Sequence, residues 1–459
     1  MERPGERIDR CLALTQHIAA SLKRHVQPGN HLTVGYSGGL DSSLLLHLLA
    51  EMRESAGFRL AAVHIHHGLS PHADAWALHC AETCRQLAVP LATHRVEVRP
   101  AGEGLEAAAR SARYRIYARL DTDVLLLAHH QDDQAETLLL QLLRGAGLKG
   151  LAAMPEARRM DEKLLLLRPL LATRRSEIEA CAAQRGLAWI NDASNDDQSL
   201  ARNALRHGVL PGLIERFPAA RTTLASAARQ FAEAAALLDM LADLDARAAL
   251  TGGSLDVVAL QTLPEVRARN LLRRFLEQSG AEIQQGQLHE ALRQLLDARR
   301  DAQVRIVFGA DSGQLVLRRY RQTALLVREA STRERVSSGS VTWQGEASMN
   351  LGDAGVLYFQ AAVGKGLPLT PGKVSIRRRQ GGERLRTGPG RPRRTLKNLL
   401  REARIPAWRR ENLPLVYVGD DLVWAAGIGA DSDYLVKADA SGWLISWQEP
   451  PHTEAQALR

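Results

Sequence analysis

Short apolar runs alternate with longer amphipathic stretches through the first 200 residues of the chain. The runs are HLTVGY, RLAAVHI, PLATHRVEV and DVLLLAHH, and each precedes or follows a segment rich in Ala or Leu. In one such segment Leu44, Leu45, Leu48 and Leu49 recur at helical spacing. Strands that alternate with helices form parallel sheets with helices on both faces. The pattern therefore predicts an α/β fold built on a doubly wound parallel sheet.

The pattern changes in the rest of the chain. Residues 200–300 have no clear strand pattern and are rich in Ala, Leu, Glu and Arg, which indicates helices, whereas AQVRIVFGADSGQLVLRRYRQTALLVRE is typical of hairpins. A stretch rich in Ser, Gly and Thr follows, and a basic segment then runs into the apolar LPLVYVGDDLVWAAGI. We expect four parts: an α/β domain at 1–217, a mainly helical domain at 218–335, a linker or edge strands at 336–370, and a small α+β domain at 371–450.

The loop YSGGLDSS stands where the first predicted strand becomes a helix. Free backbone N–H groups at such a junction attract an anion, and Gly38 and Gly39 allow the anion a close approach. The hydroxyls of Ser37, Ser42 and Ser43 are possible phosphate donors, and Asp41 suits a phosphate if Mg²⁺ intervenes. An ordinary turn with a helix cap explains the same residues equally well. The loop is neither a Walker A loop nor a GxGxxG fingerprint.

A second group of polar residues is AHHQDDQAET. On a helix Asp132, Asp133 and Glu136 crowd one face, and their mutual repulsion calls for a cation such as Mg²⁺ or the ammonium of an amine substrate. The alternative is a capping box with Asp133 at the cap and Glu136 reaching back to it. This group and the glycine loop both follow strands, and ligands of parallel sheets bind at the carboxyl ends of the strands. The two groups together favour a site, which is compatible with a cap.

Other candidates are weaker. A zinc site from His79, Cys80 and Cys84 matches no ordinary spacing and is disfavoured. Arg110 and Arg113 lie one helical turn apart and could meet phosphates, although such pairs are more often surface residues. Arg202 and Arg206 follow a loop dense in Asp and Asn, and a helix that grips a substrate explains them better than loop capping does.

Charge and composition narrow the classes of protein. The chain of 459 residues carries a formal net charge of +9, and residues 371–410 alone hold 14 Lys or Arg against two Glu. A basic folded module of this kind favours contact with a nucleic-acid backbone. The four cysteines are too few and scattered for a disulfide framework, and no signal peptide or membrane-length apolar run is evident. We expect a cytoplasmic protein, a monomer or homodimer, with no membrane or protein partner.

The loop SGGLDS resembles that of the N-type ATP pyrophosphatases, the PP-loop superfamily. In chain order, HIHHGL, ARSARY, AHHQDDQAET, RGAGLKGL, RPLL, the D-x-S-N and R-N-x-x-R patterns from Asp192 to Arg206, GGERLR and LKNLLREARIPAWRRENLPLVY extend the resemblance over most of the chain. Together they resemble the tRNA(Ile)-lysidine synthetase family. One departure is His66, where the family often carries Asn or Asp.

The resemblance implies ATP-dependent ligation of lysine to C2 of the wobble cytidine (position 34) in the CAU anticodon of tRNA(Ile), with AMP and pyrophosphate as products. An adenylated cytidine would be the intermediate, and lysidine would switch codon and amino-acid identity from Met to Ile. The helical and C-terminal domains would bind tRNA.

Roles for individual residues follow from the same resemblance. ATP binding is expected at Ser37, Gly38, Gly39, Leu40, Asp41 and Ser42. Asp41 would hold Mg²⁺, and Asp132, Asp133 and Glu136 would meet a metal or the lysine ammonium. His129 or Arg113 would stabilise charge at the α-phosphate. The residues expected to contact tRNA are Arg202, Arg206, Arg377, Arg378, Arg379, Arg384 and Lys397.

Two rival functions remain. A tRNA sulfur-inserting enzyme of the same superfamily also adenylates a pyrimidine carbonyl, but it usually needs a CxxC pair, and here only Cys80 and Cys84 are close. A nucleotide-sensing RNA-binding protein without catalysis would explain the basic module, but not the dense acidic group.

Overall fold

The structure is a computed structural model that describes residues 4–98, 104–191, 197, 200–299, 304–310, 313–329 and 340–449. The chain divides into two compact units, Met1–Leu237 and Leu238–Arg459.

The first unit is built on a six-stranded sheet in the order β3-β2-β1-β4-β6-β5. All neighbouring strands are parallel except β5, which runs antiparallel to β6 at one edge. The predicted doubly wound sheet is confirmed. Its strands are β1 (His31–Gly35), β2 (Arg59–His66), β3 (Leu91–Arg95), β4 (Val124–Leu126), β5 (Ala157–Arg159) and β6 (Leu165–Leu167).

Helices cover both faces of this sheet, because its central strands are apolar on both sides. In β4 Leu126 joins the larger core, whereas Leu125 and the following Leu127 join the smaller core on the opposite face, where Tyr117 of α4 packs. The helices that come before residue 185 are α1 (Pro4–His25), α2 (Leu40–Ala56), α3 (Ala73–Gln86), α4 (Leu105–Tyr117), α5 (Gln131–Leu143), α6 (Leu148–Leu151) and α7 (Arg175–Gln184).

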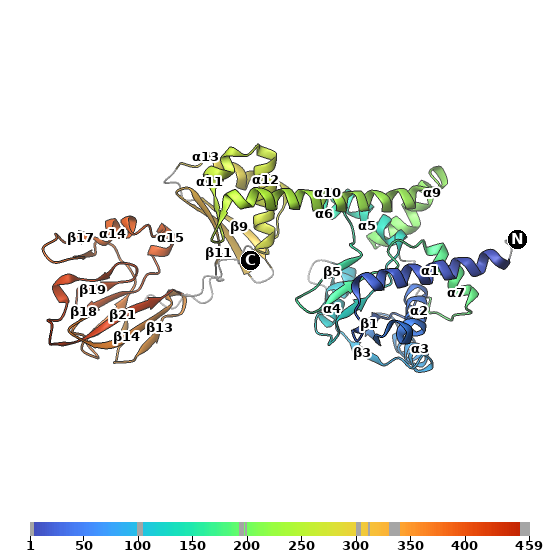
Figure 1. Cartoon of the computed structure of the whole chain (residues 1–459), viewed down its shortest axis with the longest axis horizontal. Helices are drawn as coiled ribbons and strands as arrows, with labels where there is room; N and C mark the ends of the chain where they lie inside the picture. The colour runs from blue at the N-terminus through green and yellow to red at the C-terminus, as the bar shows by residue number, and fades with distance from the viewer. Residues whose placement is uncertain are drawn as a thin grey trace. The chain divides into compact units, whose positions relative to one another are not determined.

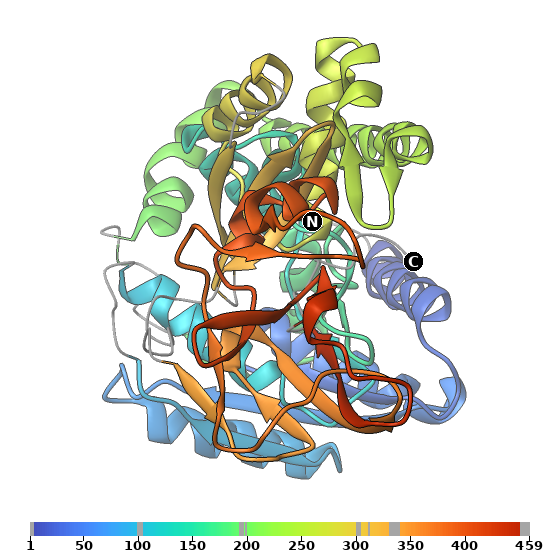
Figure 2. The same cartoon turned by 90° about the vertical axis from the view of Figure 1, so that its left-hand side faces the viewer.

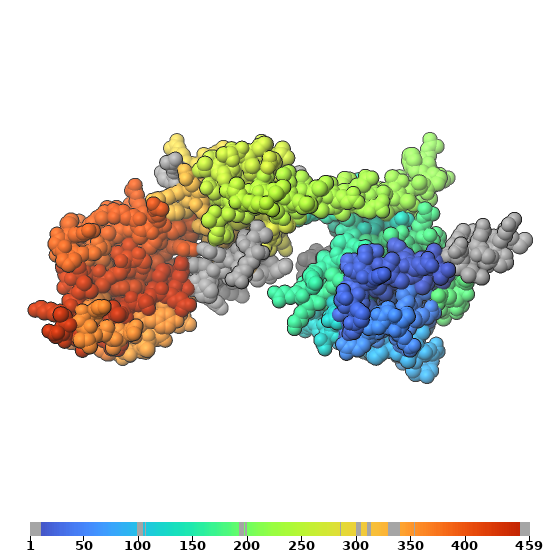
Figure 3. Space-filling model, viewed as in Figure 1, coloured from blue at the N-terminus to red at the C-terminus, as the bar shows by residue number. Residues whose placement is uncertain are grey.

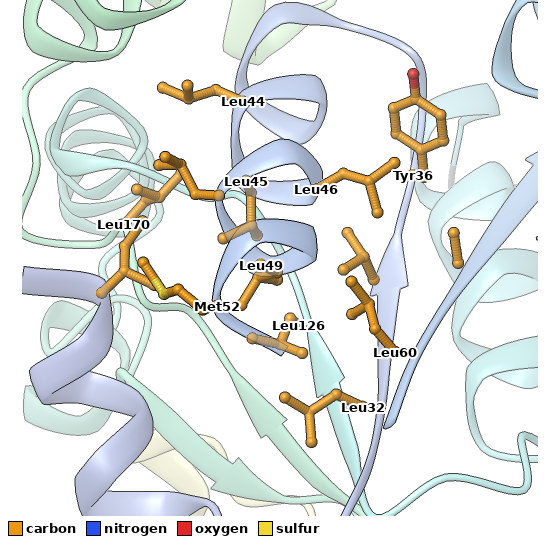
Figure 4. Packing of buried hydrophobic residues seen from close by; sticks show 14 of the residues in the cluster. Leu32, Tyr36, Leu44, Leu45, Leu46, Leu49, Met52, Leu60, Leu126 and Leu170 are labelled. Carbon is orange, nitrogen blue, oxygen red and sulfur yellow. The ribbon is translucent and has the colours of Figure 1, made fainter. Parts of the chain in front are cut away.

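Helix α2 anchors the larger core. Its residues Leu45 and Leu49 are fully buried, and Figure 4 shows them beside side chains of the neighbouring strands and loop, among them Leu32, Leu60, Leu126 and Leu170. Burial of a leucine side chain stabilises a fold by about 2 kcal/mol. The packing therefore fixes the start of α2, and with it the glycine loop, against the end of β1.

An irregular helical segment follows near residue 200. The short helix α8 (Ala201–Asn203) continues into a π-helical stretch, η2 (Ala204–Val209), and then into α9 (Leu210–Arg216). The next helix, α10 (Ala220–Ala249), is the long green helix of Figure 1, and its residues from Leu238 belong to the second unit. A π-helical turn often marks a functional site, because it displaces side chains from regular helical positions.

One pair of cysteines forms a disulfide, although the number and spacing of the cysteines predicted no disulfide framework. Cys11 in α1 and Cys181 in α7 form a disulfide across 170 residues, with their Cα atoms 5.1 Å apart. The two helices pack together, and this tertiary proximity cannot be read from positions so far apart in the sequence. Cys80 and Cys84 are free and buried.

The second unit begins with a sheet covered by helices. Its five strands lie in the order β7-β8-β11-β10-β9, and the pairs β9–β10 and β10–β11 are the predicted hairpins. The elements are β7 (Leu250–Thr251), β8 (Ser254–Asp256), α11 (Val257–Thr262), α12 (Glu265–Gln278), α13 (Gln285–Asp297), β9 (Arg305–Ala310), β10 (Gly313–Tyr320) and β11 (Thr323–Glu329).

Residues 340–449 form a mostly β body with its own apolar core. Figures 2 and 3 show it in orange to red. Its strands are β12 (Val341–Trp343), β13 (Ser348–Asn350), β14 (Val356–Val363), β15 (Val374–Arg377), β16 (Arg384–Leu385), β17 (Arg394–Thr395), β18 (Leu415–Val418), β19 (Asp421–Ala425), β20 (Gly429–Ala430) and β21 (Ser441–Gln448). Its helices are η4 (Gly352–Ala354), α14 (Leu396–Glu402), α15 (Ala407–Arg410) and η5 (Ser432–Tyr434).

Strands from the expected linker, 336–370, belong to this body. β12 pairs with β15, and β14 is the middle strand of the three-stranded sheet β13-β14-β21. The basic segment and part of the expected linker therefore fold together. Among the described residues, no helix is both long enough and apolar enough to span a bilayer.

Candidate active site

The glycine loop turns sharply between β1 and α2. Gly38 has a φ of +83°, and Gly39 is the N-cap of α2 with extended backbone angles. Because the first N–H groups of a helix have no acceptor within it, Leu40 and Asp41 stand at an end suited to an anion. A Cβ at position 38 would lie 2.4 Å from Ile190 Cδ1 and 3.0 Å from Cys80 Sγ. Only glycine fits this turn without displacing its neighbours.

The serine hydroxyls hold the loop in shape. Ser42 Oγ donates to the carbonyl of Gly39 at 3.0 Å and lies 3.0 Å from Ser37 Oγ. Ser43 Oγ donates to the carbonyl of Gly38 at 3.2 Å. The predicted phosphate donors Ser42 and Ser43 are thus buried and bonded to loop carbonyls. Because the Ser42 proton goes to Gly39, the Ser37 hydroxyl donates to Ser42 Oγ, which leaves the first backbone N–H groups of α2 as the outward donors.

A histidine connects this loop to the acidic group. His130 Nε2 lies 3.8 Å from Asp41 Oδ2 and 3.5 Å from Asp133 Oδ2, and its side chain is only 2% exposed. Burial raises the pKa of Asp41, whereas His130 and Arg175 oppose that shift. Asp41 Oδ1 is buried and has no hydrogen-bond partner among the described residues. An orphaned carboxylate oxygen beside an anion site fits a divalent cation, because Mg²⁺ is commonly held by one or two carboxylates and substrate phosphates.

Two arginines neutralise the acidic group. Arg202 donates through Nε to Glu136 at 2.8 Å and through Nη2 to Asp133 at 2.8 Å. Arg206 donates to both oxygens of Glu136, at 2.6 and 3.0 Å, and to Asp133 at 3.3 Å. Glu136 is 1% exposed. These two carboxylates and two guanidinium groups balance one another in charge, and we call the four side chains the α5 network.

In this structure, arginine side chains of the α5 network supply the positive charge opposite Asp133 and Glu136. The sequence predicted Mg²⁺ or an ammonium ion, but guanidinium groups from α8 and η2 occupy that position. Burial acts to raise the pKa of Asp133, but the neighbouring His130 and Arg202 outweigh it and hold that pKa below its usual range. Asp133 is therefore ionised at neutral pH.

The predicted capping box is wrong in its register. The N-cap of α5 is His130, whose backbone N–H donates to Asp133 Oδ2 at 2.9 Å. Glu136 faces Arg202 and Arg206 instead of reaching back to Asp133. The N-cap lies three residues before the predicted one, so that Asp133 occupies the third helical position.

Asp132 lies apart from its neighbour. Its Oδ2 forms an ion pair with Arg221 Nε at 2.9 Å, and its Oδ1 accepts from the backbone N–H of Arg175 at 3.3 Å. It thereby connects α5 to the start of α7 and to α10.

His129 and Arg113 lie on the side of the site toward α4. Burial lowers the pKa of His129 to about 3, so the ring is neutral at pH 7. Its Nδ1 accepts from Arg168 Nε at 3.2 Å, which leaves the ring proton on Nε2. Arg113 Nη2 is 3.4 Å from His67 Nε2, and burial together with Arg113 lowers the pKa of His67 to about 4. Of His129 and Arg113, only Arg113 carries a positive charge at pH 7.

The basic residues predicted to contact tRNA in the second unit differ in their surroundings. Arg377 stacks on Tyr417 with its Cζ 4.7 Å from the ring centre, Arg378 donates to Asn412 at 3.3 Å, and Arg379 pairs with Glu383 at 3.5 Å. Arg384 and Lys397 are exposed. The first group is held by neighbours, whereas the second is open to solvent.

Sequence reasoning missed several residues of the site. His130, Arg168, Arg175 and Arg221 were not selected, although His130 directly precedes the acids that it contacts. Of the two adjacent histidines, the one at the helix cap faces Asp41, and a correct helix register would have indicated it. The residues 192–195 of the D-x-S-N pattern lie outside the described residues.

The free cysteines are structural in their surroundings. Burial raises the pKa of the Cys80 thiol to about 12 and that of Cys84 to about 11. A reactive thiol needs a lowered pKa and solvent access. Nowhere in the described part of the chain do three His, Cys, Asp or Glu side chains form a cluster able to hold a metal.

Comparison with known proteins covers both units. Residues 13–213 match a family model described as a PP-loop domain, residues 255–325 match the TilS substrate binding domain, and residues 374–447 match the TilS substrate C-terminal domain. A tRNA(Ile)-lysidine synthase from Nitrosomonas europaea is 42% identical over 442 residues, 95% of each chain. One from Azoarcus sp. (strain BH72) is 41% identical over 428 residues, 92% of each chain.

A solved structure gives a weaker match. The U34-tRNA thiolase NcsA from Methanococcus maripaludis is 17% identical, with a TM-score of 0.43 over 49% of this chain and 80% of that one.

We expect Gly38→Ala to weaken ATP binding about tenfold or more. The added Cβ would displace Ile190 or Cys80 and would strain a backbone with positive φ by about 1–2 kcal/mol. Isothermal titration calorimetry with ATP measures the effect.

Gly186→Ala is the matched control. Gly186 also has a positive φ, +63°, but a Cβ there meets nothing within 4 Å. This variant should lose some stability and keep its ATP affinity. Equal ATP affinity of the Gly38→Ala variant and the unmodified protein would contradict the role of the turn.

Proposed function

The chain belongs to the tRNA(Ile)-lysidine synthase family, and we propose that it ligates lysine to C2 of the wobble cytidine (position 34) in the CAU anticodon of tRNA(Ile). ATP first transfers AMP to the C2 oxygen and releases pyrophosphate. The lysine ε-amine then attacks C2, and AMP departs with that oxygen. The observation that carries the proposal is the contact of His130 with both Asp41 and Asp133, which joins the anion-binding turn to the α5 network.

The turn would hold the pyrophosphate portion of ATP. Backbone N–H groups at Leu40 and Asp41 stand at the N-terminal end of α2, where the helix dipole favours negative charge. The free oxygen of Asp41 is suited to Mg²⁺, which when bound neutralises phosphate charge in the transition state. Ser42 and Ser43 maintain the loop shape that this requires.

The α5 network would bind the amino-acid end of lysine. Carboxylate oxygens accept more than one hydrogen bond, so Asp133 and Glu136 can receive the α-ammonium while they hold the arginines. Arg206 has more N–H donors than its contacts with Asp133 and Glu136 use, and it can meet the lysine carboxylate. Arg202 and Arg206 would thus serve lysine rather than the tRNA backbone.

Charge at the α-phosphate would be stabilised by Arg113. His129 is neutral and offers one Nε2–H donor, so its contribution is a hydrogen bond and not a positive charge. This division assigns different roles to the two residues that the sequence left as alternatives.

The basic C-terminal body would contact tRNA phosphates through its exposed cations, such as Arg384 and Lys397. Arg377, Arg378 and Arg379 are tied to neighbouring side chains, so their first role is to shape that surface. Enzymes that act on tRNA with ATP and free lysine work in the cytoplasm, and we place this chain there.

The sulfur-inserting alternative lacks a suitable cysteine. Cys80 and Cys84 are buried with raised pKa values, and Cys11 is bonded to Cys181. No described cysteine therefore meets the requirement for an exposed thiolate.

Transfer of radiolabelled lysine to tRNA tests the proposal directly. Incorporation should require ATP, Mg²⁺ and a tRNA with a CAU anticodon that accepts isoleucine, and it should be absent with methionine tRNA. An RNA-binding protein without catalysis would bind ATP and tRNA at saturation and incorporate no label.

We expect Asp41→Asn to slow adenylation of tRNA about 100-fold or more while tRNA still binds. Loss of the carboxylate removes the oxygen suited to Mg²⁺, and metal-assisted charge stabilisation contributes several kcal/mol to a transition state. Transfer of labelled AMP from ATP measures the step.

Asp121→Asn provides the control for that substitution. Asp121 is exposed and precedes β4, at the opposite edge of the sheet. The Asp121→Asn variant should adenylate tRNA at the same rate as the unmodified protein. Normal AMP transfer by the Asp41→Asn variant would refute the assignment of Asp41.

A further inference from the structure

Three arginines converge on one tyrosine beside the site. Arg110 stacks on Tyr114 of the same helix, α4, with its Cζ 4.9 Å from the ring centre, and donates to the hydroxyl at 3.3 Å. Arg158 of β5 lies over the same ring, with its Cζ 6.0 Å from the ring centre, and the buried Arg168 interacts electrostatically with Tyr114. We call Arg110, Tyr114, Arg158 and Arg168 the Tyr114 cluster.

The Tyr114 cluster has an uncompensated positive charge. Among the residues that the structure describes, no acidic side chain forms an ion pair with Arg110, Arg158 or Arg168, whereas Arg202 and Arg206 each have two acidic partners. Arg168 is only 2% exposed, and it is stabilised by neutral acceptors, the carbonyl of Pro155 at 2.8 Å and His129 at 3.2 Å. Arg110 and Arg158 are exposed. Three like charges around one ring favour an external anion.

The cluster lies at the same edge of the sheet as the phosphate-binding turn. Arg168 directly follows β6, and its partner His129 comes shortly after the end of β4. These strands are parallel to β1, so all three end at one edge. Figure 1 labels α4 and β5, which carry the exposed arginines, in the first unit. A ligand at the cluster would therefore be close to the reacting groups without occupying the turn.

We propose that the Tyr114 cluster binds backbone phosphates of the anticodon-loop nucleotides that flank the target cytidine. That the RNA is tRNA(Ile) rests on the proposed function. Guanidinium groups bind phosphate through paired hydrogen bonds and stack on unpaired bases, and arginines beside an aromatic ring are typical of single-stranded RNA sites. The phosphates of ATP already have a site at the turn after β1, so the cluster serves the other polyanion of the reaction.

The test is the salt dependence of tRNA binding by the full-length protein carrying Arg110→Ala and Arg158→Ala. Each phosphate contact that is lost lowers the slope of log affinity against log salt by about 0.7–0.9. The double variant should bind tRNA at least about tenfold more weakly at low salt, with a slope reduced by about 1–2. Its ATP affinity should be unchanged. Arg168 is left in place because it is buried.

The control removes two equivalent charges at the opposite edge of the same sheet. Arg59 begins β2, and Arg119 follows the C-terminus of α4; both are exposed. Arg59→Ala with Arg119→Ala should leave tRNA affinity and slope within experimental error of the unmodified protein.

Each outcome decides the proposal. An unchanged slope in the Arg110/Arg158 variant, an equal loss in the Arg59/Arg119 control, or a fall in ATP affinity in place of tRNA affinity would overturn it. Lysine transfer by the unmodified protein is measured separately. If that transfer fails while the cluster variant still loses tRNA affinity, the proposed function is wrong and the RNA site stands.

Discussion

The structure of the site depends on the buried ion pairs between α5 and the segment α8–η2. Charged groups are removed from water only if each charge is matched, and an unmatched charge there would cost several kcal/mol. Asp133 and Glu136 are matched by Arg202 and Arg206 through well-formed hydrogen bonds. The α5 network therefore fixes a non-regular helical segment against the end of the central sheet.

From this fixed edge the other functional groups take their positions. His130 is held at the helix cap by Asp133, and its ring lies near Asp41 at the start of α2. The turn at Gly38 can approach Ile190 and Cys80 closely because it has no side chain. The charges that act on His129 include Arg202, which has acidic partners, and Arg168, which donates to its Nδ1. The same edge thus combines a charge-balanced group, Asp133 and Glu136 with Arg202 and Arg206, with arginines that have no acidic partner among the described residues.

The sequence was sufficient for features that depend on local patterning. Buried strands such as β1 and β4 are continuous apolar runs. The paired glycines among Ser and Asp indicated a tight turn, and Gly38 does adopt a positive φ. The sequence was insufficient where the answer depends on tertiary partners. The acids of α5 were recognised, and so were Arg202 and Arg206, but their pairing spans 66–73 residues and could not be read from spacing. The cap register failed for a related reason, because the fold turns Glu136 toward Arg202 and Arg206 and places the N-cap at His130, whose backbone N–H donates to Asp133.

The most direct test of the central interaction is a double-mutant cycle between Glu136 and Arg206, read by hydrogen exchange of the α5 amides. Glu136→Gln and Arg206→Met should each lower the protection of α5 by about 2 kcal/mol or more, since each leaves a buried partner unmatched. The double variant should be no less protected than the worse single variant, which corresponds to a coupling of about 2 kcal/mol or more. Additive losses in the double variant would contradict the account.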